Sequence, residues 1–247
     1  MTAGLPSVWH AMADRIVLGV MARAASDDRG KTRLVRELGI EDGADLRRAI
    51  LLDTLEAIRP VRLADRILLF TPDDARSEIA GLGADVAYLM PQRGETLSQR
   101  LERGFADLFA LGYDAAALIG SDLPTLPAGH VDEGIEALMR LPDPLVLGPA
   151  DDGGYYFIGL RRPHPELFQG VPWSTPDVLA ATLAIAARGS LSVTLISSWY
   201  DVDTVPDLVR ALGVGDSSPP SSGRPHHLRA WAGARMRDDA DTGENVT

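Results

Sequence analysis

The chain has 247 residues, of which 45% are hydrophobic and 24% are charged, and this composition suits one globular domain with tails. A formal net charge of -11 and a pI near 4.8 would repel a phosphate backbone and an anionic bilayer, so we expect neither nucleic acid nor a membrane surface as a partner. The absence of cysteine excludes disulfides, thiolate metal sites and a cysteine nucleophile.

Apolar runs alternate with helical periodicity along the chain. The expected strands are residues 15–22, 65–71, 85–90, 115–122, 144–149 and 191–199, with another beginning at Tyr155. Several are apolar on both faces, as buried parallel strands are. Residues 45–58 and 95–111 place apolar side chains at helical spacing. The pattern predicts an α/β fold, with a Rossmann-like, mostly parallel sheet flanked by helices.

Outside this alternation we expect a short N-terminal extension (residues 1–14) and a disordered polar tail (residues 213–247), because the tail is rich in Gly, Ser, Pro and charged residues. No apolar run reaches the length of a membrane span, and no basic segment followed by a long apolar one begins the chain. We therefore expect a cytoplasmic protein. The sequence leaves the oligomeric state open.

Three expected strands end in acidic residues. Asp122 ends one strand, Asp151 and Asp152 follow another, and Asp201 and Asp203 follow a third. A single aspartate at a strand end is often only a turn former or a helix cap. Three such ends at one edge of a sheet would repel one another, and a hard divalent cation such as Mg2+ or Mn2+ would relieve that repulsion.

The sequence "DDGGYY" follows the expected strand at residues 144–149. Gly153 and Gly154 permit positive φ and close approach of the backbone to a ligand, while Asp152 points inward. Tyr155 and Tyr156 begin the next strand, where stacking on a ligand and ordinary packing are equally good interpretations.

The loop "ASDDRGKT" resembles a phosphate-binding loop in which Ala25 replaces the first glycine, so a nucleoside triphosphatase is an alternative. Asp27 and Asp28 would, however, lie where backbone amides should surround an anion. Lys31 and Arg33 can neutralise a diphosphate without that loop geometry, and a basic turn at the start of a surface helix is an equally good interpretation of each residue alone.

Taken in order, "GKTRL", "PQRGETLSQRL", "LIGSDLPTLP", "DGGYYFIGL", "WST" and "DVDT" resemble the bacterial DUF2064 family of glycosyltransferase A (GT-A) superfamily proteins. The resemblance runs over residues 15–212. It implies a nucleotide-diphospho-sugar transferase fold that binds a nucleotide through its first half and an acceptor through its second. A more distant similarity is to 2-phospho-lactate guanylyltransferase.

The resemblance also implies roles for single residues. Asp122 and Asp203 would hold the Mg2+ or Mn2+ ion, Lys31 and Arg33 would meet the diphosphate, and Asp152 would lie in the loop that flanks donor and acceptor. The remaining substrate-binding positions would be Gln92, Gly94 and Leu97 beside the base, Gly153, Gly154 and Tyr155 between donor and acceptor, and Trp173, Ser174 and Thr175 near the acceptor. Trp173 could equally be a core anchor.

One departure from the family pattern concerns the first loop. Where the family reads like "APVPGRVKTRL", this chain reads "AASDDRGKTRL", which places Asp27 and Asp28 near the expected diphosphate. The leading hypothesis is a metal-dependent glycosyltransferase that uses a nucleotide sugar and a small-molecule acceptor, with Lys31 and Asp152 as catalytic residues. A nucleotidyltransferase acting on a phosphorylated small molecule and a non-catalytic nucleotide-sugar-binding protein are the alternatives.

Overall fold

A computed structural model of the protein describes residues 14–41, 43–214 and 225–243. Within these ranges one sheet has the strand order β3-β2-β1-β4-β6-β5-β7. All neighbours are parallel except the two pairs that β6 forms, with β4 and with β5. The strands are β1 (Ile16–Arg23), β2 (Asp65–Thr71), β3 (Tyr88–Pro91), β4 (Ala115–Gly120), β5 (Pro144–Pro149), β6 (Tyr155–Leu160) and β7 (Ser192–Leu195).

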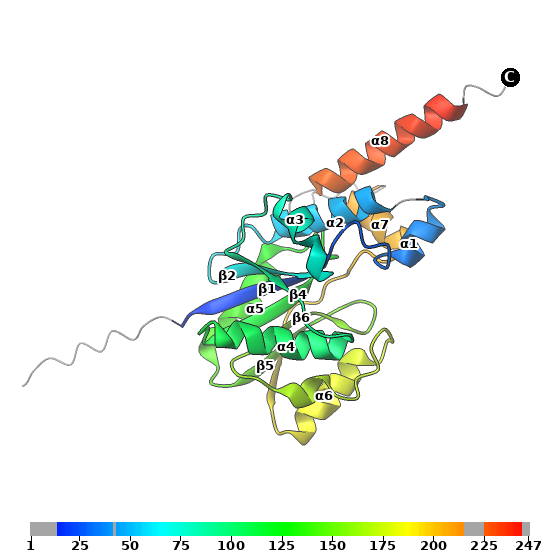
Figure 1. The fold of residues 1–247 in the computed structure, drawn as a ribbon. Coiled ribbons are helices and arrows are strands. Elements are labelled where there is room, and N and C mark those ends of the chain that lie inside the picture. The colour runs from blue at the N-terminus through cyan, green and yellow to red at the C-terminus, as the bar shows by residue number, and fades with distance from the viewer. Residues whose placement is uncertain (1–13, 42, 215–224, 244–247) are drawn as a thin grey trace, which may run out of the picture.

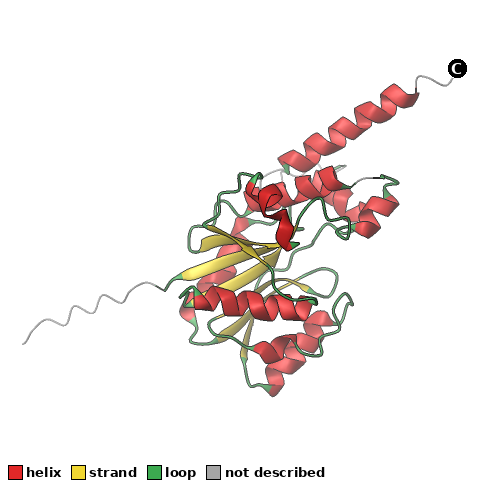
Figure 2. Ribbon diagram, in the orientation of Figure 1, coloured by secondary structure: helices red, strands yellow, loops and turns green. Residues whose placement is uncertain are grey.

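Helices cover both faces of the sheet (Figure 1). They are α1 (Thr32–Glu37), α2 (Ala44–Ala57), α3 (Arg76–Ala80), α4 (Leu97–Ala110), α5 (Ala128–Arg140), α6 (Val178–Arg188), α7 (Val205–Leu212) and α8 (His226–Gly243). The ribbon coloured by secondary structure shows the strands as a central layer between helices (Figure 2). This three-layer arrangement confirms the α/β fold with a mostly parallel sheet.

Strand alternation divides the interior into two cores. Leu18 and Val20 of β1 face the core covered by α2, α3 and α5, whereas Val17 faces the core covered by α4 and α6. Because both faces of the strand are buried, its sequence "IVLGVMAR" is almost entirely apolar. A third cluster, formed by α1, α2, α7 and α8 around Tyr200 and Val202, lies beside the carboxyl end of the sheet.

The expected strands are all present, and β2 and β5 have the predicted ends. The clearest difference concerns the last strand, which ends at Leu195 instead of continuing to Trp199. Trp199 instead forms an isolated parallel bridge with Ala150. The chain after β7 is thereby held alongside the loop that follows β5.

The predicted disordered tail is wrong for the part of it that the structure describes. Residues 226–243 form α8, which begins against α2 and extends away from the body (Figure 1). Leu228 is fully buried in the third cluster, and the Asp53 carboxylate accepts the backbone N–H groups of His227 and Leu228 at 2.9 and 2.7 Å. One buried leucine and one helix cap from a distant residue anchor the helix, and neither produces a periodic apolar pattern. Residues 1–13, 215–224 and 244–247 lie outside the described ranges.

No helix in the described part of the chain is both long and apolar enough to cross a membrane.

Leu228→Ala should lower the free energy of unfolding by about 2–5 kcal/mol, because it removes a buried side chain from the third cluster. Met236→Ala on the same helix is the matched control, since Met236 is 75% exposed, and it should change stability by less than about 0.5 kcal/mol. Denaturant unfolding measures both. Equal, small effects would mean that α8 does not pack on the domain.

Candidate active site

The three acidic strand ends meet at one cavity of about 740 Å³. Asp122 follows β4, Asp151 and Asp152 follow β5, and Asp201 and Asp203 lie on the segment after β7. That segment is tied to its neighbours by backbone hydrogen bonds, from Val202 to the Asp122 carbonyl and from Asp151 to the Trp199 carbonyl. The predicted convergence is therefore present, and it depends on backbone pairing beyond the sheet.

A buried lysine lies between two of these carboxylates. Lys31 Nζ is 2.9 Å from Asp122 Oδ2, and it also forms an ion pair with Asp203 Oδ1. The Lys31 side chain is only 7% exposed. Burial by itself lowers the pKa of Lys31, but the charges of Asp122 and Asp203 outweigh burial and raise it. The ammonium group therefore stays charged and acts as an internal cation between the carboxylates.

Crowding of the carboxylates shifts two further pKa values. Burial and the neighbouring charge of Asp203 raise the pKa of Asp201 to about 7, despite the opposing effect of Lys31. Burial also acts to raise the pKa of Asp203, but the contact with Lys31 is stronger and lowers it. Asp203 is thus the ionised partner of Lys31. Asp201 lies beside these carboxylates and forms no ion pair with a basic side chain among the described residues.

The residues fit a divalent cation. Asp122 and Asp203 contact one positive group between them, and Mg2+ or Mn2+ is commonly held by one or two carboxylates together with substrate phosphates and water. Among the described residues, a tighter group of three possible ligands occurs elsewhere, at Asp53, Glu56 and His227. There, both Asp53 oxygens already accept backbone N–H groups of α8, so that group is explained as a helix cap.

The "DDGG" loop forms one wall of the cavity. Asp152 and Gly154 line it, and Asp152 Oδ1 accepts the Gly154 N–H at 2.8 Å, which fixes the carboxylate. Gly153 has φ 89°, and a Cβ there would lie 2.2 Å from the Pro176 carbonyl oxygen. The close approach at Gly153 is thus made to Pro176, directly after the "WST" segment, and an approach of this loop to a ligand stays a prediction.

Aromatic residues form the other wall. Tyr155 and Trp173 line the cavity with their rings edge to face at 6.2 Å, and Trp173 Nε1 donates to Ser98 Oγ at 2.6 Å. Trp173 also packs against the core beneath α4 and α6, as the core-anchor interpretation expects, and its role near an acceptor stays a prediction. Tyr156 is buried and donates its hydroxyl to the Ser197 carbonyl at 2.8 Å. Other predicted residues on this lining are Leu97, Ser174 and Thr175.

The predicted donor-side residues are only partly brought to the cavity. Arg33 lines it and pairs with Glu37 at 3.0 Å. Gln92 is buried instead, and its side-chain amide donates to the carbonyls of Ala22 and Leu69 at 3.0 and 2.8 Å, so it ties β1 to β2. Gly94 has φ 124° in the turn before α4. Gln92 and Gly94 are not among the lining residues.

The first loop differs from the sequence-based expectation because Asp27 is paired. Asp27 Oδ2 accepts from Arg23 Nη1 at 2.5 Å and from Arg29 Nη2 at 2.8 Å, and Oδ1 accepts from Arg29 Nε at 2.8 Å. The hydrogen bonds of Arg29 are the main cause of a lowered pKa at Asp27. A charge held in this way by two arginines would repel a diphosphate far less than the sequence suggests.

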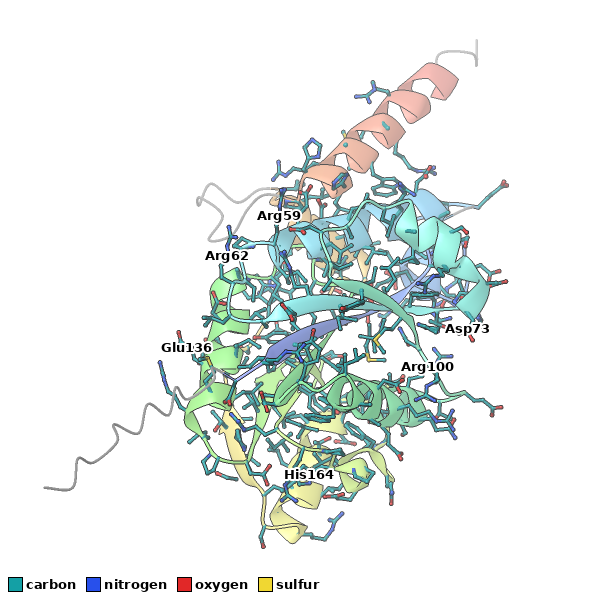
Figure 3. All side chains as sticks on the ribbon, turned by 60° about the vertical axis from the view of Figure 1, so that its left-hand side comes forward. Arg59, Arg62, Asp73, Arg100, Glu136 and His164 are labelled. Carbon is teal, nitrogen blue, oxygen red and sulfur yellow. The ribbon has the colours of Figure 1, made fainter. Side chains whose placement is uncertain are left out.

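A third arginine reinforces the positive character of this region. Burial and the charges of Arg23 and Arg29 lower the pKa of Arg100, whose Nε donates to the Gly94 carbonyl at 2.9 Å. Figure 3 shows Arg100 on the same side of the molecule as Asp73. The charge of Asp73 acts to raise the pKa of Arg100. Arg23, Arg29 and Arg100 were not expected here, although Arg29 and Arg100 lie within the motifs "ASDDRGKT" and "PQRGETLSQRL".

The family model described as an uncharacterized protein conserved in bacteria (DUF2064) matches residues 54–175. The chain belongs to the DUF2064 family. The matched residues include Asp122, Asp152 and Trp173, whereas Lys31 and Asp203 lie outside them.

Three proteins that are similar to this DUF2064 protein are described as transferases. It is 29% identical over 197 residues to the phosphoenolpyruvate guanylyltransferase of Sphaerobacter thermophilus, a match that covers 77% of this chain and 92% of the relative. A crystal structure from Desulfovibrio desulfuricans G20, assigned to the nucleotide-diphospho-sugar transferases, has 30% identity and a TM-score of 0.74, covering 87% of this chain and 94% of that one. A nucleotidyl transferase from Methanothermobacter has 17% identity and a TM-score of 0.56, covering 87% and 99%, and shows the fold alone.

These likenesses and the geometry disfavour the triphosphatase alternative for the DUF2064 protein. Lys31 is turned toward two carboxylates and not into a loop of free backbone amides. The antiparallel β6 also interrupts the parallel sheet. The shared fold is that of a transferase acting on nucleotides.

Asp27→Asn should lower the free energy of unfolding by about 1–3 kcal/mol at pH 7, because Arg23 and Arg29 lose a charged acceptor. The pKa of Asp27 is lowered in the folded state, so its contribution is complete above the unfolded value of about 3.9 and is lost as the pH falls through the folded value. The difference in melting temperature between variant and parent should therefore shrink below about pH 4.

Asp28→Asn is the matched control, since Asp28 is adjacent and makes no ion pair among the described residues. Its effect should be small and should not follow that pH dependence. A variant at Asp27 that melts with its parent at pH 7 would contradict the pairing.

Proposed function

We propose that this DUF2064 protein is a divalent-metal-dependent glycosyltransferase that moves a sugar from a nucleotide sugar to a small acceptor. The observation that carries the proposal is the pair of carboxylates, Asp122 and Asp203, which share one cation at a cavity that continues to the "DDGG" loop and Trp173. One end of the cavity can thus hold a metal-bound diphosphate and the other an acceptor. The Desulfovibrio relative supports a nucleotide-sugar donor.

A Mg2+ or Mn2+ ion at Asp122 and Asp203 would supply positive charge to the diphosphate as it leaves. Lys31 adds a second positive charge at the same carboxylates, because its ammonium group remains charged while buried. Arg33, at the edge of the cavity, can donate to phosphate oxygens.

The acceptor side provides the base. Asp152 Oδ1 is occupied by the Gly154 N–H, which leaves Oδ2 to accept the proton of an acceptor hydroxyl. The hydroxyl oxygen then bonds to the anomeric carbon, the bond from that carbon to the diphosphate oxygen breaks, and a nucleoside diphosphate leaves. The Trp173 ring beside Tyr155 offers an apolar face to a sugar.

Nucleotidyl transfer is the second candidate, and the 29% identity to phosphoenolpyruvate guanylyltransferase favours it. In that reaction a phosphorylated acceptor attacks the α-phosphate of a nucleoside triphosphate, and pyrophosphate leaves. The same two carboxylates would hold the metal ion.

The released product separates the two reactions. Nucleotide sugars and nucleoside triphosphates are first screened by thermal shift with and without Mn2+, because a ligand that binds only the folded state raises the melting temperature. The protein is then incubated with each binding donor and a panel of acceptors. We expect a nucleoside diphosphate from a nucleotide sugar. Pyrophosphate from a triphosphate, with no diphosphate from any sugar donor, would establish nucleotidyl transfer instead.

Asp122→Asn should abolish the Mn2+-dependent part of donor binding while the protein stays folded. The Asp122 side chain is 41% exposed, and Lys31 keeps Asp203 as a partner. Asp85→Asn is the control, because Asp85 is an exposed aspartate paired with Arg66 outside the cavity. Calorimetry of donor binding with Mn2+ and with a chelator measures the effect. Parent-like Mn2+ dependence in Asp122→Asn would refute the metal site.

A further inference from the structure

The charge of the cavity lining is strongly one-sided. Among the described residues, six aspartates line it, and Arg33 is the one basic residue on the same lining. The lining aspartates are Asp122, Asp151, Asp152, Asp201, Asp203 and Asp207. No phosphate-binding cluster of arginines or lysines stands among them.

Pairing with nearby basic groups removes only part of this negative charge. Lys31 contacts Asp122 and Asp203 together. Arg210 pairs with Asp151 at 2.8 Å and also lies over the Tyr200 ring, 3.7 Å from its centroid. Asp152, Asp201 and Asp207 form no ion pair with a basic residue in the described part of the chain.

The hydrogen bonds of Asp152 and Asp207 do not cancel the charge of these two carboxylates. Asp207 accepts the Thr204 N–H at 2.8 Å as a cap of α7, and Asp152 accepts the Gly154 N–H. Both are neutral donors. The single basic residue of the lining, Arg33, is itself shared with Glu37. An anion entering from the Asp152 side would therefore find carboxylates and no free cation.

The aromatic wall of the cavity also disfavours anionic ligands. The Trp173 ring is fixed by its hydrogen bond to Ser98 and meets Tyr155 edge to face. Aromatic faces carry partial negative charge, so they favour cations and the C–H groups of sugars over phosphate or carboxylate. The lining thus combines a negative field with a surface suited to a polyol or an amine.

We propose that the acceptor is a neutral or cationic hydroxyl compound, such as a sugar, a polyol or an amino alcohol, that carries no phosphate or carboxylate. This inference rests on glycosyl transfer at the same site. A bound metal ion and donor would not reverse this preference, because the charge of a divalent ion at Asp122 and Asp203 would act on the diphosphate of the donor. A phosphorylated acceptor, as nucleotidyl transfer requires, would meet the unpaired carboxylates.

Quenching of Trp173 fluorescence tests the field of the cavity directly. Trp173 lines the cavity and is partly exposed. Its signal is obtained as the difference between the parent and Trp173→Phe, and it is quenched with caesium, iodide and neutral acrylamide at constant ionic strength. Each quenching constant is divided by that of a free tryptophan derivative.

The normalised constant for iodide should be lower than that for caesium by about twofold or more, because the negative field excludes the anion. Asp151→Asn should raise the iodide constant, since it removes a carboxylate from the lining and frees Arg210. Asp143→Asn is the matched control, because it removes an aspartate paired with Arg162 outside the cavity and should leave the ratio unchanged. An iodide constant equal to or above that of caesium overturns the proposal.

A matched series of acceptors gives a second test of the proposed acceptor charge. Glucosamine, glucose and glucose 6-phosphate differ mainly in charge. A protein that turns over the phosphorylated sugar in preference to glucose contradicts the inference. Failure of the function itself is distinguishable: without release of nucleoside diphosphate from any donor, glycosyl transfer fails, while the quenching ratio still reports the charge of the cavity.

Discussion

The arrangement of the site depends on the contact of Lys31 with Asp122 and Asp203. It joins the residue before α1, the end of β4 and the segment after β7, which are far apart in the sequence. The ammonium group is buried, and an unpaired buried charge is costly, so the lysine needs a carboxylate partner while it stays charged. The same contact keeps two carboxylates close together that would otherwise repel each other. In the folded protein, the Lys31 ammonium group fills the place between these two carboxylates.

Sheet topology explains why these groups converge. β1 lies between β2 and β4, so the chain leaves β1 at the point where the strand order reverses direction. Ligands of open α/β sheets bind beyond the carboxyl ends of the strands at such points. The first loop with Lys31 follows β1, and Asp122 follows the adjacent β4. The antiparallel β6 then places the end of β5 on the same side, and Asp152 with it.

The fold and the convergence of the acidic strand ends could be predicted from the sequence, because both follow from apolar runs that end in aspartate. The hydrogen-bonding and ion-pairing partners of individual side chains could not be predicted. Whether Asp27 faces an anion or two arginines depends on Arg23 and Arg29 turning back within the loop. Gln92 stands in a family motif, yet it serves the backbone of β1 and β2. The start of α8 is held by Asp53, which precedes it by more than a hundred positions, and no local pattern signals that cap.

The two halves of the cavity differ in how they are built, and this difference bears on specificity. Beside Asp122 and Asp203, one buried lysine meets two carboxylates, so the ion pairs there leave a net negative charge. Beside Asp152, the wall is set by backbone contact, because Gly153 packs against Pro176 and Leu179 donates its N–H to the Gly153 carbonyl at 3.0 Å. A side chain at Gly153 would separate the "DDGG" and "WST" segments. Since this wall holds its shape largely through backbone contacts, the charge of Asp152 would act on the acceptor in the glycosyl transfer that we propose.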